Sequence, residues 1–319
     1  MLLLIQYTLV FASVLLLVAL GGCISEHSGV INLGLEGIMV MGALGGALVM
    51  KFIPYDAASA GFFNSLGVFL LIMLASVIVG ALFSLLLAVA CINFKADQTI
   101  VGTALNLLGT ALATVVVKSM NTAMNPDDHS SEIKYYNARS AFITNIGKFE
   151  LNWFMIIAVI MLVVCFILLY KTRFGLRLRA CGEHPQAADS VGINVYKMRY
   201  WGVVLSGILA GLGGITYITA GVSVWRFEDG VAGFGFLALA VMIFGGWHPF
   251  KIAGAALLFG LFRALGNVYS GFDFLKNLNI PSGIYNMLPY IVSLIVLAFT
   301  SKNSKAPKAE GIPYDKGQR

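Results

Sequence analysis

Charged side chains are scarce in this chain of 319 residues. Asp, Glu, Lys and Arg make up 11% of it, whereas a soluble domain carries about 25%. Hydrophobic residues make up 59%. This balance excludes an ordinary soluble globular protein and indicates that lipid is the solvent for most of the chain.

The motifs of the common catalytic sites are also missing. The four cysteines form no CxxC pair, so the sequence predicts neither a metal site nor a disulfide framework. There is no GxxxxGK[ST] phosphate loop, no HExxH zinc motif and no GxSxG nucleophile turn, and the four histidines are far apart in the sequence. We therefore expect no catalytic residue, no cofactor and no enzymatic activity.

What the chain does have is long apolar segments. A helix needs about 20 apolar residues to cross about 30 Å of hydrocarbon. Nine segments meet or nearly meet this length: 2–22, 29–50, 66–92, 98–117, 151–170, 200–220, 231–247, 252–270 and 283–300. The sequence thus predicts an all-α polytopic membrane protein, with a transmembrane domain at 1–300 and a basic tail at 301–319. The uncharged run 57–94 has room for an extra re-entrant piece, and 231–247, which begins GVAGFGF, is typical of a broken helix.

Lys and Arg predict how the spans are oriented. The loop 171–199 and the tail are both rich in basic residues, so the positive-inside rule places both in the cytoplasm. An even number of predicted spans lies between them, which is consistent. Counting back places the N-terminus and the charge-balanced loop 118–150 outside. The first segment has no basic region before it, so we interpret it as a retained span and not as a signal peptide.

Two distant segments resemble each other. SGVINLGLEGIMVMGALGG at 28–46 and DGVAGFGFLALAVMIFGGW at 229–247 share six residues at one constant offset, Gly29 and Gly230 being the first pair. The predicted spans that contain them run in opposite directions. This is the pattern of an inverted repeat, which in transporters places the substrate path at the repeat interface. Chance matching of Gly, Ala and Val is the alternative.

The first of these segments supplies two pathway candidates, Asn32 and Glu36. We expect Glu36 about a turn and a half inside its helix, where an ionised carboxylate costs about 2.5–3.5 kcal/mol and should face protein or water. It would then line or gate a path. The alternative is an acid stabilised locally by the N-terminal end of a helix.

The second segment and its neighbour supply three more candidates. Phe234 and Phe236 can stack on a planar solute beside a glycine-interrupted helix. Arg263 is the basic residue well inside a span, where it can neutralise Glu36, contact an anionic solute or extend to the membrane surface. Trp225 and Trp247 suit membrane-interface anchors.

The stretch ACGEHPQAADSVGINV at 180–195 has a helix-forming order within the basic loop. We expect a short helix from Glu183 to Asp189 with a proline in its first turn, ended by Gly192 at positive φ. Ala187 and Ala188 would offer a small-residue surface that another protein can approach closely. An ordinary basic membrane flank is the alternative.

Two long motifs give the chain a family resemblance. RACGEHPQAADSVGINVYKMRYWGVVLSGILAGLGG resembles the ATPase-coupling loop of permease subunits of ABC importers, in the branch for branched-chain amino acids, ribose-type sugars and purine nucleosides. ISEHSGVINLGLEGIMVMGA is similar to the N-terminal signature of that branch, and APKAEGIPYDKG is similar to tails of its nucleoside, or simple-sugar, subgroup.

The resemblance implies a function and partners. It implies a bacterial inner-membrane permease that pairs with a second permease, with ATPase subunits and with an extracytoplasmic binding lipoprotein, and that binds no nucleic acid. A nucleoside such as guanosine is the leading substrate, and a ribose- or galactose-type sugar is the alternative. An ion-coupled secondary transporter is a third hypothesis, but it needs several buried acids, and Glu36 is the single candidate.

Overall fold

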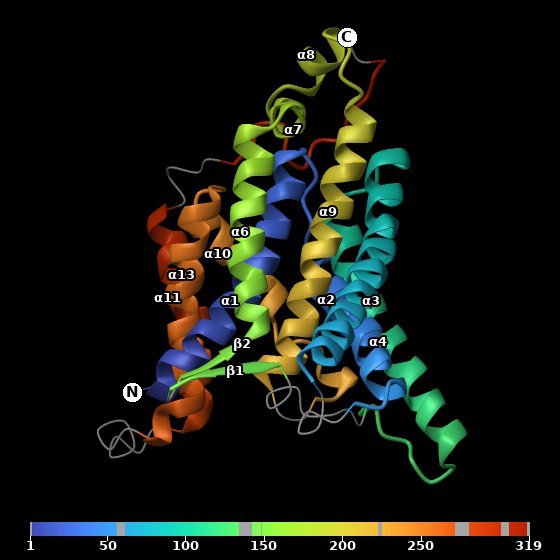
Figure 1. Ribbon diagram of the computed structural model, residues 1–319. Helices are drawn as coiled ribbons and strands as arrows, with labels where there is room; N and C mark the ends of the chain where they lie inside the picture. The colour runs from blue at the N-terminus through green and yellow to red at the C-terminus, as the bar shows by residue number, and fades with distance from the viewer. Residues whose placement is uncertain are drawn as a thin grey trace.

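The computed structural model describes residues 2–55, 61–133, 142–147, 149–222, 225–271, 281–300 and 306–317. Helices dominate this part of the chain (Figure 1). The main helices are α1 (Leu2–His27), α2 (Leu35–Phe52), α3 (Phe62–Ala88), α4 (Gln98–Met124), α6 (Trp153–Lys171), α9 (Val195–Thr216), α10 (Phe234–Phe244), α11 (Pro249–Val268) and α13 (Ser282–Thr300). The smaller elements are α7 (Arg173–Glu183), α8 (Pro185–Ser190), the hairpin β1 (Ile143–Ile146) and β2 (Phe149–Asn152), the π-helical turns Val89–Asn93 and Tyr217–Gly221, and the 3-10 turns Phe227–Asp229 and Tyr269–Gly271.

The predicted all-α membrane architecture is confirmed. Each of the nine predicted spans has a helix at its position, and eight helical segments among the described residues are long and apolar enough to cross a membrane. Some boundaries were wrong. α1 continues to His27 and α2 begins only at Leu35, because residues 28–34 leave the helical path. The suggested re-entrant piece in 57–94 is absent from the described part of that run, since 62–93 is one continuous helix with a π turn at its end.

The packing of the helices agrees with the predicted inverted repeat. α1 packs along α9 and α11, while α9 packs along α1 and α3. Exchanging α1 with α9 and α3 with α11 therefore reproduces these three helix contacts. α2 and α10 lie at corresponding places, and their N-termini meet head to head through Glu36 and Gly235, so the two helices run away from each other. Helices of opposite direction at equivalent positions are what an inverted repeat produces.

Glycines allow the central helices to approach closely. A Cβ at Gly42 of α2 would collide with the backbone of Gly211 of α9. On the equivalent side, a Cβ at Gly260 of α11 would stand 2.8 Å from the backbone nitrogen of Ala12 of α1. Small residues at crossings are the usual basis of packing between membrane helices, where lipid supplies no hydrophobic drive.

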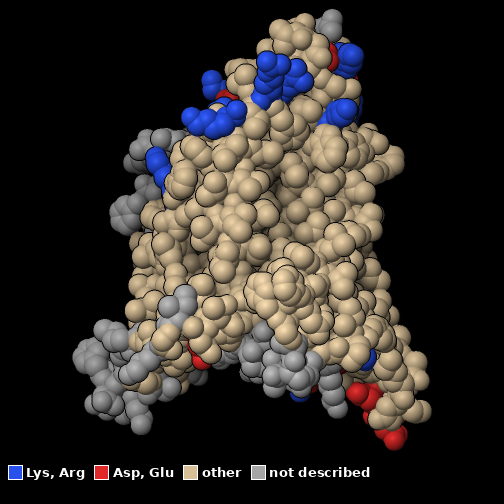
Figure 2. Space-filling view, in the orientation of Figure 1, with Lys and Arg blue, Asp and Glu red and all other residues tan. Residues whose placement is uncertain are grey.

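The two ends of the molecule differ. The N-terminus and the β hairpin lie at one end, and α7, α8 and the C-terminal residues lie at the other (Figure 1). Lys and Arg gather at the end with α7 and α8 (Figure 2), which we call the basic end. The asymmetry that predicted the topology is therefore a property of the folded surface.

Candidate functional site

The central feature is the point where α2 and α10 begin. Glu36 lies in the first turn of α2, and its carboxylate accepts hydrogen bonds from the backbone N–H of Gly233 (2.8 Å) and of Gly235 (2.6 Å) at the start of α10. One side chain thus caps the neighbouring helix, whose N-terminal dipole favours a negative group. Glu36 is not a turn and a half inside its helix, as the sequence had suggested, because α2 begins one residue before it.

The length of α10 gives the depth of this capping point. α10 has 11 residues and leads to Trp247, which donates to Glu26 near the end of α1 that faces α7. At 1.5 Å per residue, 11 residues cover about 16 Å. Because hydrocarbon is about 30 Å thick, Glu36 lies near its middle when the basic end meets the membrane surface. The expectation that 231–247 is a broken helix is confirmed.

Two asparagines fix the non-helical segment before α2. Asn32 is fully buried, donates to Ser206 Oγ (2.9 Å) and accepts from the N–H of Gly34 (3.1 Å). Asn106 of α4 accepts from Gly37 N–H and donates to the Leu33 carbonyl, both at 2.8 Å. Both amide side chains therefore satisfy backbone and side-chain groups that would otherwise stay unpaired in lipid. Asn32 faces no open space in this conformation.

Aromatic rings and an arginine surround the capping point. Phe234 is fully buried, its ring centroid lies 4.8 Å from that of Tyr217, and the guanidinium carbon of Arg263 lies 5.4 Å from its ring. Arg263 forms no ion pair with Glu36 in the part of the chain that the structure describes. Of the three roles that the sequence left open for Arg263, direct neutralisation of Glu36 is therefore not observed. The Arg263 Nε has no hydrogen-bond partner among the described residues. Phe236, in contrast, is 48% exposed on the outer face of α10.

The backbone just before α10 is strained. Ala232 has φ +52° and Gly233 has φ +76°, and a left-handed conformation is costly for alanine. Tyr290 of α13 holds this turn by donating to the Ala232 carbonyl (2.6 Å). Trp225 donates in the same way to the Gly230 carbonyl (2.6 Å). Trp225 and Trp247 are each 5% exposed, so the expectation that they anchor at the membrane surface was wrong.

The predicted coupling segment forms at the basic end. Glu183, which is exposed, ends α7, and α8 runs from Pro185 to Ser190, so the chain breaks at His184 instead of forming one helix from Glu183. Pro185 is in the first turn of α8 and Gly192 has φ +83°, as predicted. Asp189 lies near Lys316, with 4.0 Å between the charged atoms.

The two alanines of α8 point to different sides. Ala187 is exposed, whereas Ala188 is 4% exposed and packs with Cys181, Val195 and Tyr314. Only Ala187 therefore offers a surface to another protein. The expectation that Ala188 does so was wrong, because Ala188 lies on the inward face of α8 and is buried in a small hydrophobic core.

Sequence reasoning missed the docking of residues 306–317, which we call the strap. Its contacts are Ala309 N–H to Gly182 O (2.8 Å), Gly311 N–H to Gly29 O (3.3 Å), Arg199 Nη1 to Ile312 O (2.9 Å) and the Lys95–Asp315 ion pair (2.9 Å). The strap therefore joins the turn after α1, the loop after α3, α7 and α9 at the basic end. A run of Pro, Gly and Lys carries no periodic signal that predicts this.

The strap also brings two acids together. The Glu310 carboxyl lies against that of Glu26 and shares a side-chain hydrogen bond with it. Burial raises the pKa of Glu310 to about 7, and the hydrogen bond from Glu26 partly offsets this increase. A proton is therefore part of the docked arrangement near neutral pH.

These features together describe a membrane permease, and comparison with known proteins agrees. Residues 4–300 match the family described as "Branched-chain amino acid transport system / permease component". The chain belongs to this family and is a multi-pass membrane protein of the transport-permease class, which is not a class of enzymes.

Similar proteins cover nearly the whole chain. "Guanosine ABC transporter permease protein NupQ" of Bacillus subtilis is 40% identical over 318 residues, 98% of this chain and 96% of the relative. "Nucleoside ABC transporter permease protein NupC" of Lactococcus lactis is 40% identical over 314 residues, with 97% and 96% covered. "Putative glucose ABC transporter permease protein TsgC13" of Haloferax volcanii is 30% identical over 312 residues, with 93% and 91% covered.

Proposed function

We propose that this chain is a membrane-spanning permease subunit of an ABC importer for nucleosides. The choice of a nucleoside as the substrate rests on sequence identity. The identity is 40% to each of the guanosine and nucleoside permeases and 30% to the putative glucose permease. Import is driven by ATP hydrolysis on separate subunits, since the sequence lacks a phosphate-binding loop.

The pathway in this proposal passes the capping point. Phe236, two residues after Phe234 on α10, has an exposed ring, and the buried Phe234 ring lies 5.4 Å from the guanidinium carbon of Arg263. A nucleoside base is planar and stacks on aromatic rings, which supports this assignment. Glu36 acts mainly as a gate support, because its carboxylate is occupied by two backbone amides.

Coupling to ATP hydrolysis follows a continuous backbone route. α7 and α8 meet the ATPase, with Glu183, Ala187, Asp189 and Gly192 on or beside the contact surface. Gly182 packs against the backbone of His27 and Gly29. The chain runs from there through 30–34 to Glu36 and so to the start of α10. A shift of α7 therefore reaches the capping point through directly packed segments.

The subunit sits in a bacterial cytoplasmic membrane with the basic end in the cytoplasm and the N-terminus outside, as the positive-inside rule predicts. A binding lipoprotein delivers the solute on the outer side, and a second permease completes the pathway. The exposed apolar residues of α4, such as Leu107 at 76%, provide a face for lipid or for that subunit.

Uptake into cells that express the complete transporter tests the substrate. We expect radiolabelled guanosine to accumulate, unlabelled nucleosides to compete and ribose, galactose or glucose not to compete. Competition by a sugar and none by nucleosides would establish the sugar alternative.

The energy source is tested in the same cells. Uptake should persist when ionophores collapse the ion gradients at constant ATP, and transport driven by a gradient without ATP would refute the ABC mechanism.

A further inference from the structure

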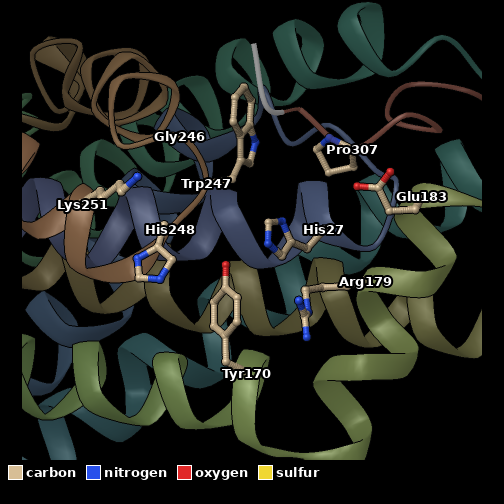
Figure 3. Close-up of a pocket in the computed structure, with 9 residues that line it drawn as sticks. All are labelled: His27, Tyr170, Arg179, Glu183, Gly246, Trp247, His248, Lys251 and Pro307. Carbon is tan, nitrogen blue, oxygen red and sulfur yellow. The ribbon is translucent and has the colours of Figure 1, made fainter. Parts of the chain in front are cut away.

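A cavity of about 310 Å³ opens at the basic end (Figure 3). It lies between the end of α1, the end of α6, α7, the corner that joins α10 to α11, and the strap. The lining residues are His27, Tyr170, Arg179, Glu183, Gly246, Trp247, His248, Lys251 and Pro307. None of them belongs to the capping point, and only Glu183 was assigned above to the ATPase contact surface. The function proposed above assigns no ligand to the cavity.

Two cations from different helices line this cavity, and neither forms an ion pair with a described residue. Neither Arg179 of α7 nor Lys251 of α11 forms an ion pair with any residue that the structure describes. Arg179 lies over the Tyr170 ring, with its guanidinium carbon 4.7 Å from the ring centroid. This contact fixes its position, while its buried Nε lacks a hydrogen-bond partner. Glu183 is the one acid in the lining, and it is exposed.

Two histidines add unused polar atoms. His27 is 8% exposed, and its buried Nδ1 has no partner among the described residues. The Nδ1 of His248 is buried and unpartnered in the same way. Burial and the neighbouring Lys251 charge hold the pKa of His248 below its usual range, so its ring is neutral near pH 7 and offers one N–H donor. Buried polar atoms without partners call for an explanation, and a bound ligand with acceptor oxygens supplies one.

We propose that this cavity binds a phosphate group, held by Arg179 and Lys251 and contacted by His27 and His248. A phosphate has the acceptor oxygens and the negative charge that these groups lack. The favoured source is the headgroup of an anionic phospholipid. Basic pockets between transmembrane helices near the membrane surface bind such headgroups.

The surroundings of the cavity support a lipid source. α6 presents Val163 and Ile167 with 45% and 47% exposure, and Phe250 at the start of α11 is 50% exposed. Phe250 packs on Phe166 of α6, with 4.8 Å between ring centroids. Acyl chains attached to a phosphate in the cavity would therefore lie against apolar side chains of α6 and α11.

The test is ligand binding to the purified full-length chain in detergent. Added ligands are phosphatidylglycerol, phosphatidylcholine and inorganic phosphate, and binding is followed by native mass spectrometry and by thermal shift. The variants are Lys251→Gln and Arg179→Gln. Arg177→Gln is the matched control, since it removes the same charge from an exposed position of α7 that does not line the cavity.

We expect phosphatidylglycerol to bind more tightly than phosphatidylcholine, and each cavity variant to lose about fivefold in affinity while the control loses little. Lys251 is exposed, so its replacement leaves the fold intact even if Arg179→Gln unfolds. Binding of inorganic phosphate alone, lost in the same variants, would confirm the phosphate site and identify a free anion as its source. Equal binding of both lipids with no phosphate binding, or an equal loss in the control, would overturn the proposal.

Discussion

The Glu36 carboxylate receives two backbone amides at a depth where water is scarce, so its replacement should be costly. In Glu36→Gln one acceptor oxygen becomes an NH2 group that faces an amide donor. We expect the free energy of unfolding to fall by about 1–3 kcal/mol, the cost of an unsatisfied buried group, and uptake to fall with it. Thermal unfolding in detergent and uptake assays measure both. Glu150→Gln, an exposed acid of β2, serves as control. Wild-type stability of Glu36→Gln would show that the carboxylate is dispensable.

The opposite orientations of Ala187 and Ala188 separate docking from folding. Ala187→Trp adds a large ring to the exposed side of α8 and should reduce ATPase recovery while leaving thermal stability unchanged. Ala188→Trp must enter the small core with Cys181 and Tyr314, so it should lower stability, by about 1–3 kcal/mol. Co-purification with the ATPase measures docking of both variants, and thermal unfolding measures their stability. Full ATPase recovery with Ala187→Trp would place the ATPase elsewhere.

At the scale of the helices, the crossing of α2 and α9 tests whether close packing of small residues stabilises the fold. In Gly42→Ala the new methyl group meets the backbone of Gly211, which cannot rotate away. We expect a loss of about 1–3 kcal/mol in unfolding free energy. Gly254→Ala on α11 makes the same chemical change where no atom lies within 4 Å, and should be neutral or slightly stabilising. Equal unfolding free energies for the two variants would contradict the role of Gly42 in close helix packing.

Docking of the strap should depend on pH through Glu310. Its pKa of about 7 in the docked state exceeds its ordinary value of 4.5, so the docked state binds the extra proton between these values. Docking is therefore strongest below pH 4.5, weakens as pH rises through 7 and changes little above it. A dye on Lys308→Cys should show lower anisotropy at about pH 8 than at about pH 6.

Glu310→Gln tests that assignment directly. The amide keeps the shape and the hydrogen-bonding capacity of a neutral carboxyl group but does not ionise. The anisotropy difference between the two pH values should disappear in this variant. If the difference persists, another group controls the strap.

At the scale of the whole molecule, the orientation can be tested with single cysteines. The four native cysteines are all buried, so the wild type provides an unlabelled background. Asp127→Cys lies at the end opposite α8, and Gln186→Cys lies on α8; both positions are exposed. An impermeant maleimide should label Asp127→Cys in intact spheroplasts and Gln186→Cys only after permeabilisation. The reverse result would invert the topology.

Sequence periodicity predicted the architecture well because lipid demands long apolar helices. It failed where local hydrogen bonds override that demand. Asn32 and Asn106 hold residues 28–34 out of the helix, which moved the start of α2 and the depth of Glu36. The glycine echo between 28–46 and 229–247 did predict that the two segments correspond, but not that the acid of one caps the other.

Other site features have no signature in one-dimensional spacing. The burial of Ala188 depends on contacts with Val195 of α9 and Tyr314 of the strap. The cavity of Arg179 and Lys251 unites five separate segments. Such contacts arise only when the chain folds back on itself, so neither residue pattern nor composition predicts them.

The strap sets an order for biosynthesis. Residues 306–317 leave the ribosome after every described helix, whereas Gly29, to which Gly311 binds, emerges tens of seconds earlier at about 5–20 residues per second. Until then the end of α1 and the backbone of Gly182 lack these partners. The surface at α7 and α8 is therefore completed only after α13 has been inserted, and a half-synthesised chain presents an unfinished surface at that end.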